Sequence, residues 1–390
     1  MAPPRPDTVA IHGRRREGHG PVSTPIHLTS TWRLESVSQA RRLVEATAPD
    51  AFYTRWGNPT TRDLEETLAR LEGGHAALAT GSGMAAIAAT LLTAAGEGDH
   101  IVASRPLYGG TMALLGDWLP RFGVTCTFVD PARPGSWREA VRPETAVVFI
   151  ESPANPTLVL TDFREAVAAA RSVGAVTVCD NTFATPVNQR PREFGIDIVL
   201  HSASKYLGGH SDVVAGAVVV PDRGWHRRLW DTVRLLGPVL GPVEAFLVRR
   251  GLKTLGVRVR QQNRTARALA EFLEGHRAVS RVAYPGLPSF AQRQIARRQM
   301  SGGGGILAFD LRGGARAARR FVEHVRVATL AVSLGGCETL VEHPASMTHG
   351  PLTANERARA GIEADLVRVS VGLEDIEDLK EDFARALRAS

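Results

Sequence analysis

Two side chains that can do chemistry come after predicted strands in the middle of the chain. Asp180 ends one apolar run, and Lys205 follows the next one, preceded by the hydroxyls of Ser202 and Ser204. A lysine amine can form a Schiff base with an aldehyde, and a carboxylate can pair with a protonated ring nitrogen. Either residue alone would be typical of a protein surface. Their chemistry therefore depends on whether the fold brings them together.

A glycine turn adds a third feature. Gly81-Ser82-Gly83-Met84 lies between an apolar run and a predicted helix, where free backbone N–H groups can hold a phosphate. An amine, a carboxylate and a phosphate site together are what pyridoxal 5′-phosphate (PLP) requires. The same turn also fits the G-x-G-x-x-[GA] pattern of a dinucleotide site, with Asp99 as the acid that follows. A tight turn with a purely structural role is the third interpretation, and all three stay open on these residues.

The elements that must position these residues alternate between helical and strand patterns. Helices are predicted over 63–72, 84–95, 111–122 and 162–173, and strands or apolar runs over 75–80, 100–104, 124–129, 145–150, 175–179, 196–200 and 215–220. This alternation predicts an α/β fold with a large, mostly parallel sheet that is covered on both faces. In such sheets ligands bind at the carboxyl ends of the strands, which is where Asp180 and Lys205 fall.

The rest of the chain predicts two further parts. Residues 1–55 are punctuated by Pro, Gly and Ser and form no unit of their own. Late in the chain, helices are predicted over 249–274, 315–324 and 377–387, with strands over 306–311 and 366–371. We therefore predict an N-terminal arm (1–55), a PLP-binding domain (56–245) and a smaller C-terminal α/β domain (246–390).

Composition narrows the possible functions. The 390 residues carry a formal net charge of +7, with 47 Lys and Arg against 40 Asp and Glu. The basic residues are dispersed among acids apart from the run 14–16, so we expect a solvated arm and no nucleic-acid partner. The longest apolar run, 84–95, is too short to cross a bilayer, and no apolar signal segment follows the N-terminus. We therefore expect no membrane partner. The three scattered cysteines predict a cytoplasmic protein, and since no metal-ligand spacing is present we expect no metal.

Seven motifs follow one another along the chain from about residue 20 to the end. They lie at 53–60, 82–84, 107–110, 151–157, 180–186, 202–205 and 368–374. Together they closely resemble the trans-sulfuration (Cys/Met metabolism) family of fold-type-I PLP enzymes. This family includes methionine γ-lyase, cystathionine γ-lyase, cystathionine γ-synthase and O-acylhomoserine sulfhydrylases. The resemblance implies a PLP-dependent transferase fold and a small amino-acid substrate.

The resemblance also implies a role for each matching residue around the cofactor. Lys205 would be the Schiff-base lysine, Asp180 would keep the pyridine nitrogen protonated, and Asn155 would contact the ring oxygen O3′. Tyr108 would stack on the ring and act as acid or base near the leaving group. The residues that would hold the phosphate are Ser82, Gly83, Met84, Ser202 and Ser204.

Other matching residues concern the substrate and a second subunit. Arg368 would grip the substrate α-carboxylate through its planar fork, with Ser333 nearby. Tyr53 and Arg55 match residues that, in relatives, reach the phosphate of a neighbouring subunit. The resemblance therefore implies a homo-oligomer in which the dimer is obligatory and the tetramer is the usual assembly.

Two positions bear on the reaction and point in different directions. Val332 stands where relatives that use cystathionine generally carry Glu. A valine there, as in methionine γ-lyases, favours a substrate whose distal group is apolar or short. Gly110 stands where methionine γ-lyases typically carry Cys. We predict γ-elimination from methionine, homocysteine or a related Cγ-substituted amino acid, giving a 2-oxo acid, ammonia and a thiol. A γ-replacement enzyme, including one of secondary metabolism, and a cystathionine γ-lyase stay open. From other classes, an NAD-dependent oxidoreductase and a nucleic-acid-binding protein stay open too.

Overall fold

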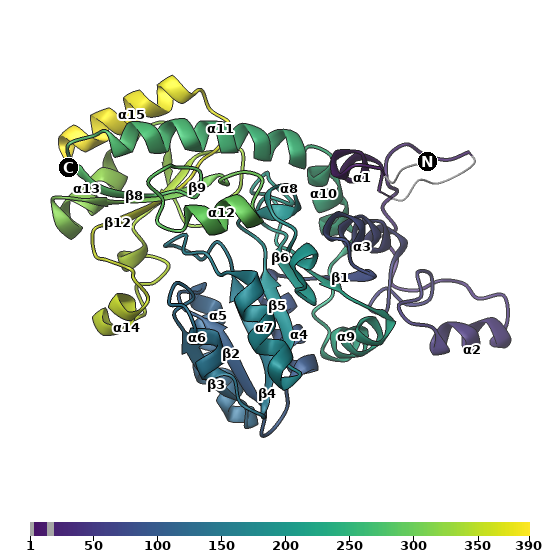
Figure 1. The fold of residues 1–390 in the computed structure, drawn as a ribbon. Helices are drawn as coiled ribbons and strands as arrows, with labels where there is room; N and C mark the ends of the chain where they lie inside the picture. The colour runs from purple at the N-terminus through teal and green to yellow at the C-terminus, as the bar shows by residue number, and fades with distance from the viewer. Residues whose placement is uncertain (1–3, 14–18) are drawn as a thin grey trace.

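A seven-stranded sheet forms the centre of the larger part of the molecule (Figure 1). The computed structural model describes residues 4–13 and 19–390. The strand order is β1-β7-β6-β5-β4-β2-β3, and β7 alone runs antiparallel to its neighbours. The strands are β1 (Ala76–Thr80), β2 (His100–Ser104), β3 (Thr125–Val129), β4 (Thr145–Glu151), β5 (Val176–Asp180), β6 (Ile198–Ser202) and β7 (Gly216–Val220). The predicted α/β fold with a mostly parallel sheet is confirmed.

Helices cover both faces of this sheet, because successive strand residues enter two different apolar clusters. In β4, Val148 and Ile150 pack with α3, α7 and α10, whereas Val147 and Phe149 pack with α4 and α9. The helices around the sheet are α3 (Pro59–Glu72), α4 (Gly83–Ala94), α5 (Gly109–Ala113), α6 (Ser136–Ala140), α7 (Phe163–Val173), α8 (Thr185–Asn188), α9 (Arg223–Leu236) and α10 (Pro242–Leu252). Single turns of other helix types lie at Leu114–Trp118, Leu119–Phe122 and Pro191–Phe194, so the predicted helix 111–122 is a series of short turns.

The carboxyl ends of β1, β4, β5 and β6 meet at one edge of the sheet, because these four strands run in the same direction. The glycine turn follows β1, Glu151 ends β4, Asp180 ends β5, and Ser202 ends β6. The expectation that Asp180 and the segment leading to Lys205 share an edge with the start of α4 therefore agrees with the topology.

A second, five-stranded sheet with the order β10-β11-β12-β9-β8 lies in the C-terminal part. Its strands are β8 (Val279–Ala283), β9 (Ile306–Leu311), β10 (Thr329–Leu330), β11 (Leu340–Glu342) and β12 (Leu366–Ser370), and the short helix Pro344–Ser346 follows β11. Helices of this part are α11 (Leu255–Glu274), α12 (Arg293–Gln299), α13 (Gly314–His324), α14 (Ala354–Arg359) and α15 (Ile376–Ala389). In Figure 1, α11 and α15 run side by side along one side of the molecule, and their residues share the core of this sheet.

The prediction of one helix over 249–274 is wrong, because the chain breaks between α10 and α11. The carbonyl of Gly251, near the end of α10, accepts hydrogen bonds from Thr254 Oγ1 at 3.2 Å and from Arg258 Nη2 at 2.8 Å. These side-chain bonds satisfy a carbonyl in the last turn of α10, and α11 begins at Leu255. The predicted domain boundary at 246 falls within α10, which packs on α3, and the three-part division stays a prediction.

The N-terminal segment begins on the body of the molecule and then leaves it. Helix α1 (Pro6–His12) contacts α3 and α11, and Arg249 donates to the carbonyls of Ala10 and Ile11 at 2.8 and 3.0 Å. Helix α2 (Val37–Glu45) has no buried residue and stands away from the body in Figure 1. The basic run 14–16 lies outside the described residues. Within the described ranges, we find no helix with the length and apolar character needed to cross a membrane.

Candidate active site

Lys205 lies three residues beyond β6 and contacts a loop of the C-terminal part. Its Nζ donates a hydrogen bond of 2.7 Å to Ser333 Oγ. Burial lowers the pKa of Lys205, and the nearby Arg368 lowers it further. Ser333 has φ +88°, a left-handed conformation that costs a non-glycine residue about 1–3 kcal/mol and is typical of functional sites. The Lys205 amine, whose pKa is closer to neutrality than that of a free lysine, therefore faces this strained loop.

Arg368 is buried on β12 beside Lys205, and its side chain is held by three groups. Nη1 donates to Asn155 Oδ1 and to Glu342 Oε1, each at 2.9 Å, and Nη2 donates to the Ser333 carbonyl at 2.6 Å. A guanidinium has five N–H donors, so one on Nη2 and the Nε–H are left over. The Nε atom is buried and has no partner among residues 4–13 and 19–390. Two donors of one planar fork are thus available for a carboxylate.

A buried carboxylate at the end of β4 holds the segments that carry Tyr108 and Asn155. Glu151 Oε2 accepts the backbone N–H of Tyr108 at 2.9 Å, and Oε1 accepts that of Asn155 at 2.7 Å. A Cβ built at Gly110 would lie 2.7 Å from Tyr108 Cε1 and 3.0 Å from Met84 Sδ. The Tyr108 ring therefore lies against Gly110 near the start of α4, and it is 44% exposed.

The start of α4 packs directly against the end of β6. A Cβ at Gly83 would lie 2.8 Å from Ser202 Cβ, so only glycine allows this approach. Ser82 caps the helix, with Oγ accepting the Ala85 N–H at 3.0 Å. This leaves the N–H groups of Gly83 and Met84 without an acceptor inside the helix. The first turn of α4 is therefore suited to an anion.

The two serines before Lys205 differ in their contacts. Ser202, beside Gly83, uses its backbone N–H to donate to Thr182 Oγ1 at 2.8 Å. Ser204 Oγ accepts the Ala215 N–H at 2.9 Å and donates to the Ala215 carbonyl at 3.2 Å. The Ser204 hydroxyl thus closes the loop before β7, and its hydrogen would have to leave this carbonyl to reach a phosphate.

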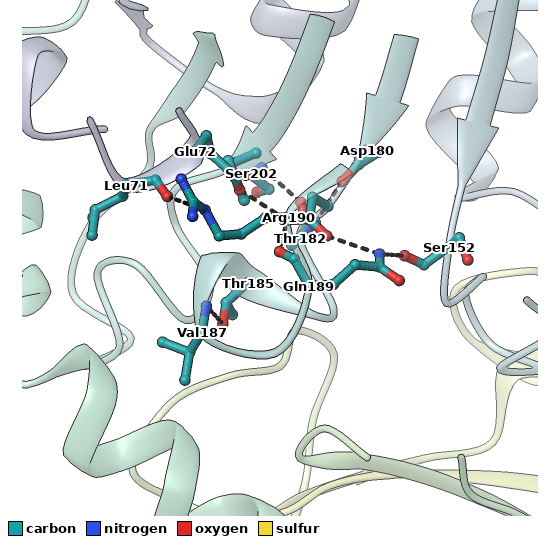
Figure 2. A network of polar contacts seen from close by, with 12 residues as sticks. Leu71, Glu72, Ser152, Asp180, Thr182, Thr185, Val187, Gln189, Arg190 and Ser202 are labelled. Carbon is teal, nitrogen blue, oxygen red and sulfur yellow. Dashed lines mark hydrogen bonds and ion pairs between the residues drawn. The ribbon is translucent and has the colours of Figure 1, made fainter. Parts of the chain in front are cut away.

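Asp180 is fixed at the end of β5 by the turn that follows it (Figure 2). Its Oδ1 accepts the Thr182 N–H at 2.9 Å, which links Asp180 through Thr182 to Ser202 on the neighbouring strand. Burial raises the pKa of Asp180, while hydrogen bonding from Thr182 and, to a smaller extent, His201 oppose that rise. Figure 2 also shows Glu72, whose Oε1 contacts His201 Nε2 at 2.7 Å. A network of polar contacts thus joins the ends of β5 and β6 to each other and to Glu72 at the end of α3.

Three predicted site residues do not join this cluster within the chain. Tyr53 is 41% exposed, and the Arg55 guanidinium lies 5.4 Å from its ring centre. Arg55 Nη1 donates to the carbonyl of Arg234, a residue of α9, at 2.5 Å. Arg55 therefore lies against α9 of its own chain. Val332 is 55% exposed, next to Ser333. The other predicted residues are linked to one another by the contacts above, and of these Ser333 is the one that hydrogen-bonds Lys205.

The model of the Cys/Met metabolism PLP-dependent enzyme family matches residues 7–388. The chain belongs to this family. It is therefore a PLP-dependent enzyme, and the dinucleotide and nucleic-acid interpretations are set aside.

Individual members of the family align along nearly the whole chain. An L-methionine gamma-lyase of Treponema denticola is 45% identical, covering 97% of this chain and 95% of its own length. An O-succinylhomoserine sulfhydrylase of Pseudomonas aeruginosa is 40% identical, covering 98% and 95%. A solved cystathionine gamma synthase of Xanthomonas oryzae pv. oryzae, in complex with cystathionine, is 41% identical with a TM-score of 0.94, covering 100% and 99%. The predicted family and fold are confirmed.

The site suits PLP in three independent respects. It has a half-buried amine with a lowered pKa, a carboxylate at the end of a neighbouring strand, and a helix start that only a glycine lets approach the sheet. Two buried acids at the site, Glu151 and Glu342, were not singled out from the sequence. Glu151 is an acid at the end of an apolar strand, as Asp180 is, and that pattern could have identified it. Glu342 ends a strand of three residues, which is too short to give such a signal.

Proposed function

We propose that this PLP enzyme catalyses γ-elimination from methionine, homocysteine or a similar Cγ-substituted amino acid, releasing a 2-oxo acid, ammonia and a thiol. The observation that carries this proposal is the apolar residue Val332, which directly precedes Ser333, the residue whose hydroxyl accepts from the Lys205 amine. A glutamate at this position could pair with a distal ammonium of the substrate, whereas valine offers that ammonium no opposite charge. The relatives named L-methionine gamma-lyase, at 45% identity, support the same assignment.

The residues proposed to hold the cofactor come from the edge of the large sheet. The Lys205 amine is the group that binds it covalently, and the Asp180 carboxylate pairs with its ring nitrogen. The phosphate is held by the Gly83 and Met84 N–H groups in the turn that Ser82 caps, and by the Ser202 hydroxyl, with Ser204 as a further donor. Asn155 still has its side-chain N–H donors for the ring oxygen, since its Oδ1 accepts from Arg368.

Bound PLP supplies an electron sink that acidifies the C–H bonds near the substrate nitrogen. The residues of the chain then bind the substrate and move protons. Arg368 binds the α-carboxylate through its Nε and Nη2 donors, which orients the amino acid toward Lys205. The lowered pKa of the Lys205 amine suits it to accept a proton from Cα and to return one elsewhere. The Tyr108 phenol is the group proposed to deliver a proton to the departing thiolate.

We also propose that the active unit is a homo-oligomer, with a dimer as its smallest form and a tetramer as the usual one. The exposure of Tyr53 and the absence of any buried residue in α2 support this, because a segment that its own chain leaves uncovered is suited to contact with a second copy. Tyr53 and Arg55 would then complete the partner's phosphate site. Mixing inactive Lys205→Ala and Arg55→Ala chains after subunit exchange should restore part of the activity, since one site of each hybrid dimer is intact. No recovery despite confirmed exchange would count against this arrangement. The cytoplasmic location stays a prediction.

A γ-replacement reaction is the second candidate, and Gly110 favours it. The Tyr108 ring occupies the space that a larger side chain at position 110 would need. The ring must therefore lie in a different position from that in a site with Cys at 110. The similarity to a cystathionine gamma synthase and to an O-succinylhomoserine sulfhydrylase agrees with this candidate.

The two candidates are separated by product analysis. The purified enzyme is incubated with methionine, cystathionine, cysteine and O-acetylhomoserine, each with and without an added thiol. We expect 2-oxo acid and thiol from methionine at a higher rate than from cystathionine. Thioether formation from O-acetylhomoserine plus thiol, with little 2-oxo acid, would establish replacement instead. A rate with cystathionine far above that with methionine would overturn the argument from Val332.

A further inference from the structure

Glu151 is a buried carboxylate that the proposed reaction leaves without a role. It is 4% exposed at the end of β4, and its backbone is held by Ser104 Oγ, which accepts the Glu151 N–H at 3.2 Å. Glu151 and Asp180 are register partners on adjacent parallel strands, so their side chains lie on the same face at the site edge. A buried charge is costly unless it is hydrogen-bonded, so a specific use for this carboxylate is expected.

The partners of Glu151 indicate that use. Its two oxygens accept the backbone N–H groups of Tyr108 and Asn155, at 2.9 and 2.7 Å. These partners belong to two separate loops, one after β2 and one after β4. The Tyr108 phenol makes no hydrogen bond within the described residues, and its ring is 44% exposed. Its location at the site therefore depends on its backbone.

Asn155 connects Glu151 to Arg368, the residue proposed to bind the substrate carboxylate. Asn155 Oδ1 accepts from Arg368 Nη1, so a shift of the Asn155 backbone would also move one of the three anchors of Arg368. One carboxylate thus sets the relative positions of Tyr108, Asn155 and, through Asn155, the Arg368 side chain.

We infer that Glu151 is a positioning residue for the reaction, acting through Tyr108 and Asn155 by accepting one backbone N–H with each carboxylate oxygen. The inference rests on the proposed PLP chemistry at this site. This role requires both carboxylate oxygens of Glu151 as acceptors. A carboxamide at the same position cannot fill it, because its NH₂ group would face one of the two N–H donors. Burial and the neighbouring Asp180 raise the pKa of Glu151, and the two N–H bonds oppose that rise because they stabilise the ionised carboxylate.

The test is a double-mutant cycle with Glu151→Gln and Tyr108→Phe, using the PLP-loaded enzyme and whichever amino acid it turns over. We expect Glu151→Gln to lower kcat at least tenfold and to alter the visible circular dichroism of the bound cofactor. We expect the double variant to be no worse than the poorer single variant within about twofold, because a displaced Tyr108 already lacks its phenol contact. The control is Asp197→Asn, which also replaces a carboxylate that accepts a backbone N–H, at 2.9 Å from Thr177, and it should keep wild-type kcat and dichroism.

Additive losses in the cycle, or a Glu151→Gln enzyme with wild-type kcat and dichroism, would overturn the inference. If Glu151→Gln does not give folded protein, the cycle is run with Glu151→Asp, which keeps both acceptors but withdraws them by one methylene. The non-additivity does not depend on which amino acid is the physiological substrate. A failure to bind PLP at all in the wild type would instead count against the proposed function.

Discussion

Replacing Gly83 by alanine would put a methyl group 2.8 Å from Ser202 Cβ and 3.0 Å from Ser202 Cα. Ordinary contacts begin near 3.4 Å, so the start of α4 and the end of β6 would have to separate by at least about 0.6 Å. Neither contact is with the end of a flexible side chain, and overpacking of this kind costs about 1–3 kcal/mol. The residues that separate are the ones proposed to hold the phosphate. If the strain falls on cofactor binding, PLP affinity drops about 5- to 150-fold.

The matched control is Gly81→Ala in the same turn, where the nearest atom to a new Cβ is the Val239 carbonyl oxygen at 3.4 Å. PLP binding is measured by titrating each apoenzyme and following cofactor absorbance, and the unfolding temperature is recorded with and without PLP. We expect Gly81→Ala to match wild type and Gly83→Ala to bind PLP more weakly with a smaller stabilisation by the cofactor. Equal affinities and equal unfolding temperatures for Gly83→Ala and wild type would refute the packing argument. A loss of the same size in both variants would show that the turn conformation matters, and not the contact with Ser202.

Two further predictions concern stability. Arg249→Ala should lower the free energy of unfolding by about 3–5 kcal/mol, since it leaves Asp63, paired at 3.0 Å and buried, without its counter-ion; denaturant titration would show this, and a loss under 1 kcal/mol would contradict it. His226 is buried and its pKa is lowered to about 4, so the folded state resists protonation and stability is lost as pH falls from about 6.5 toward 4. His226→Gln should therefore remove about 2 kcal/mol of the loss of stability between pH 8 and pH 5, and parallel pH profiles of variant and wild type would rule this out.

Sequence patterns located the half of the site that follows strands of the large sheet. Asp180 and Lys205 could be assigned to one edge because parallel strands end there together, and the glycine turn marks the start of α4 by the same logic. These features depend on local periodicity and on strand direction, which apolar runs report well.

The other half depends on how distant segments meet, which periodicity does not report. Strands β10 and β11 have two and three residues, too few to show an alternating pattern, so the approach of Ser333 to Lys205 could not be anticipated in detail. The break before α11 is likewise set by Arg258 reaching back to the Gly251 carbonyl. Tyr53 and Arg55 cannot be explained from one chain, because their proposed role needs a second copy.

Lys205 is the residue proposed to carry the cofactor, and borohydride reduction followed by peptide mapping can identify the lysine that does. The purified enzyme with PLP is reduced, digested, and analysed by mass spectrometry for the phosphopyridoxyl group. We expect loss of the visible absorption and a single labelled peptide with the modification on Lys205, absent in Lys205→Ala. A label on Lys253 or Lys380, or a preparation that neither absorbs nor reacts after PLP is added, would contradict it.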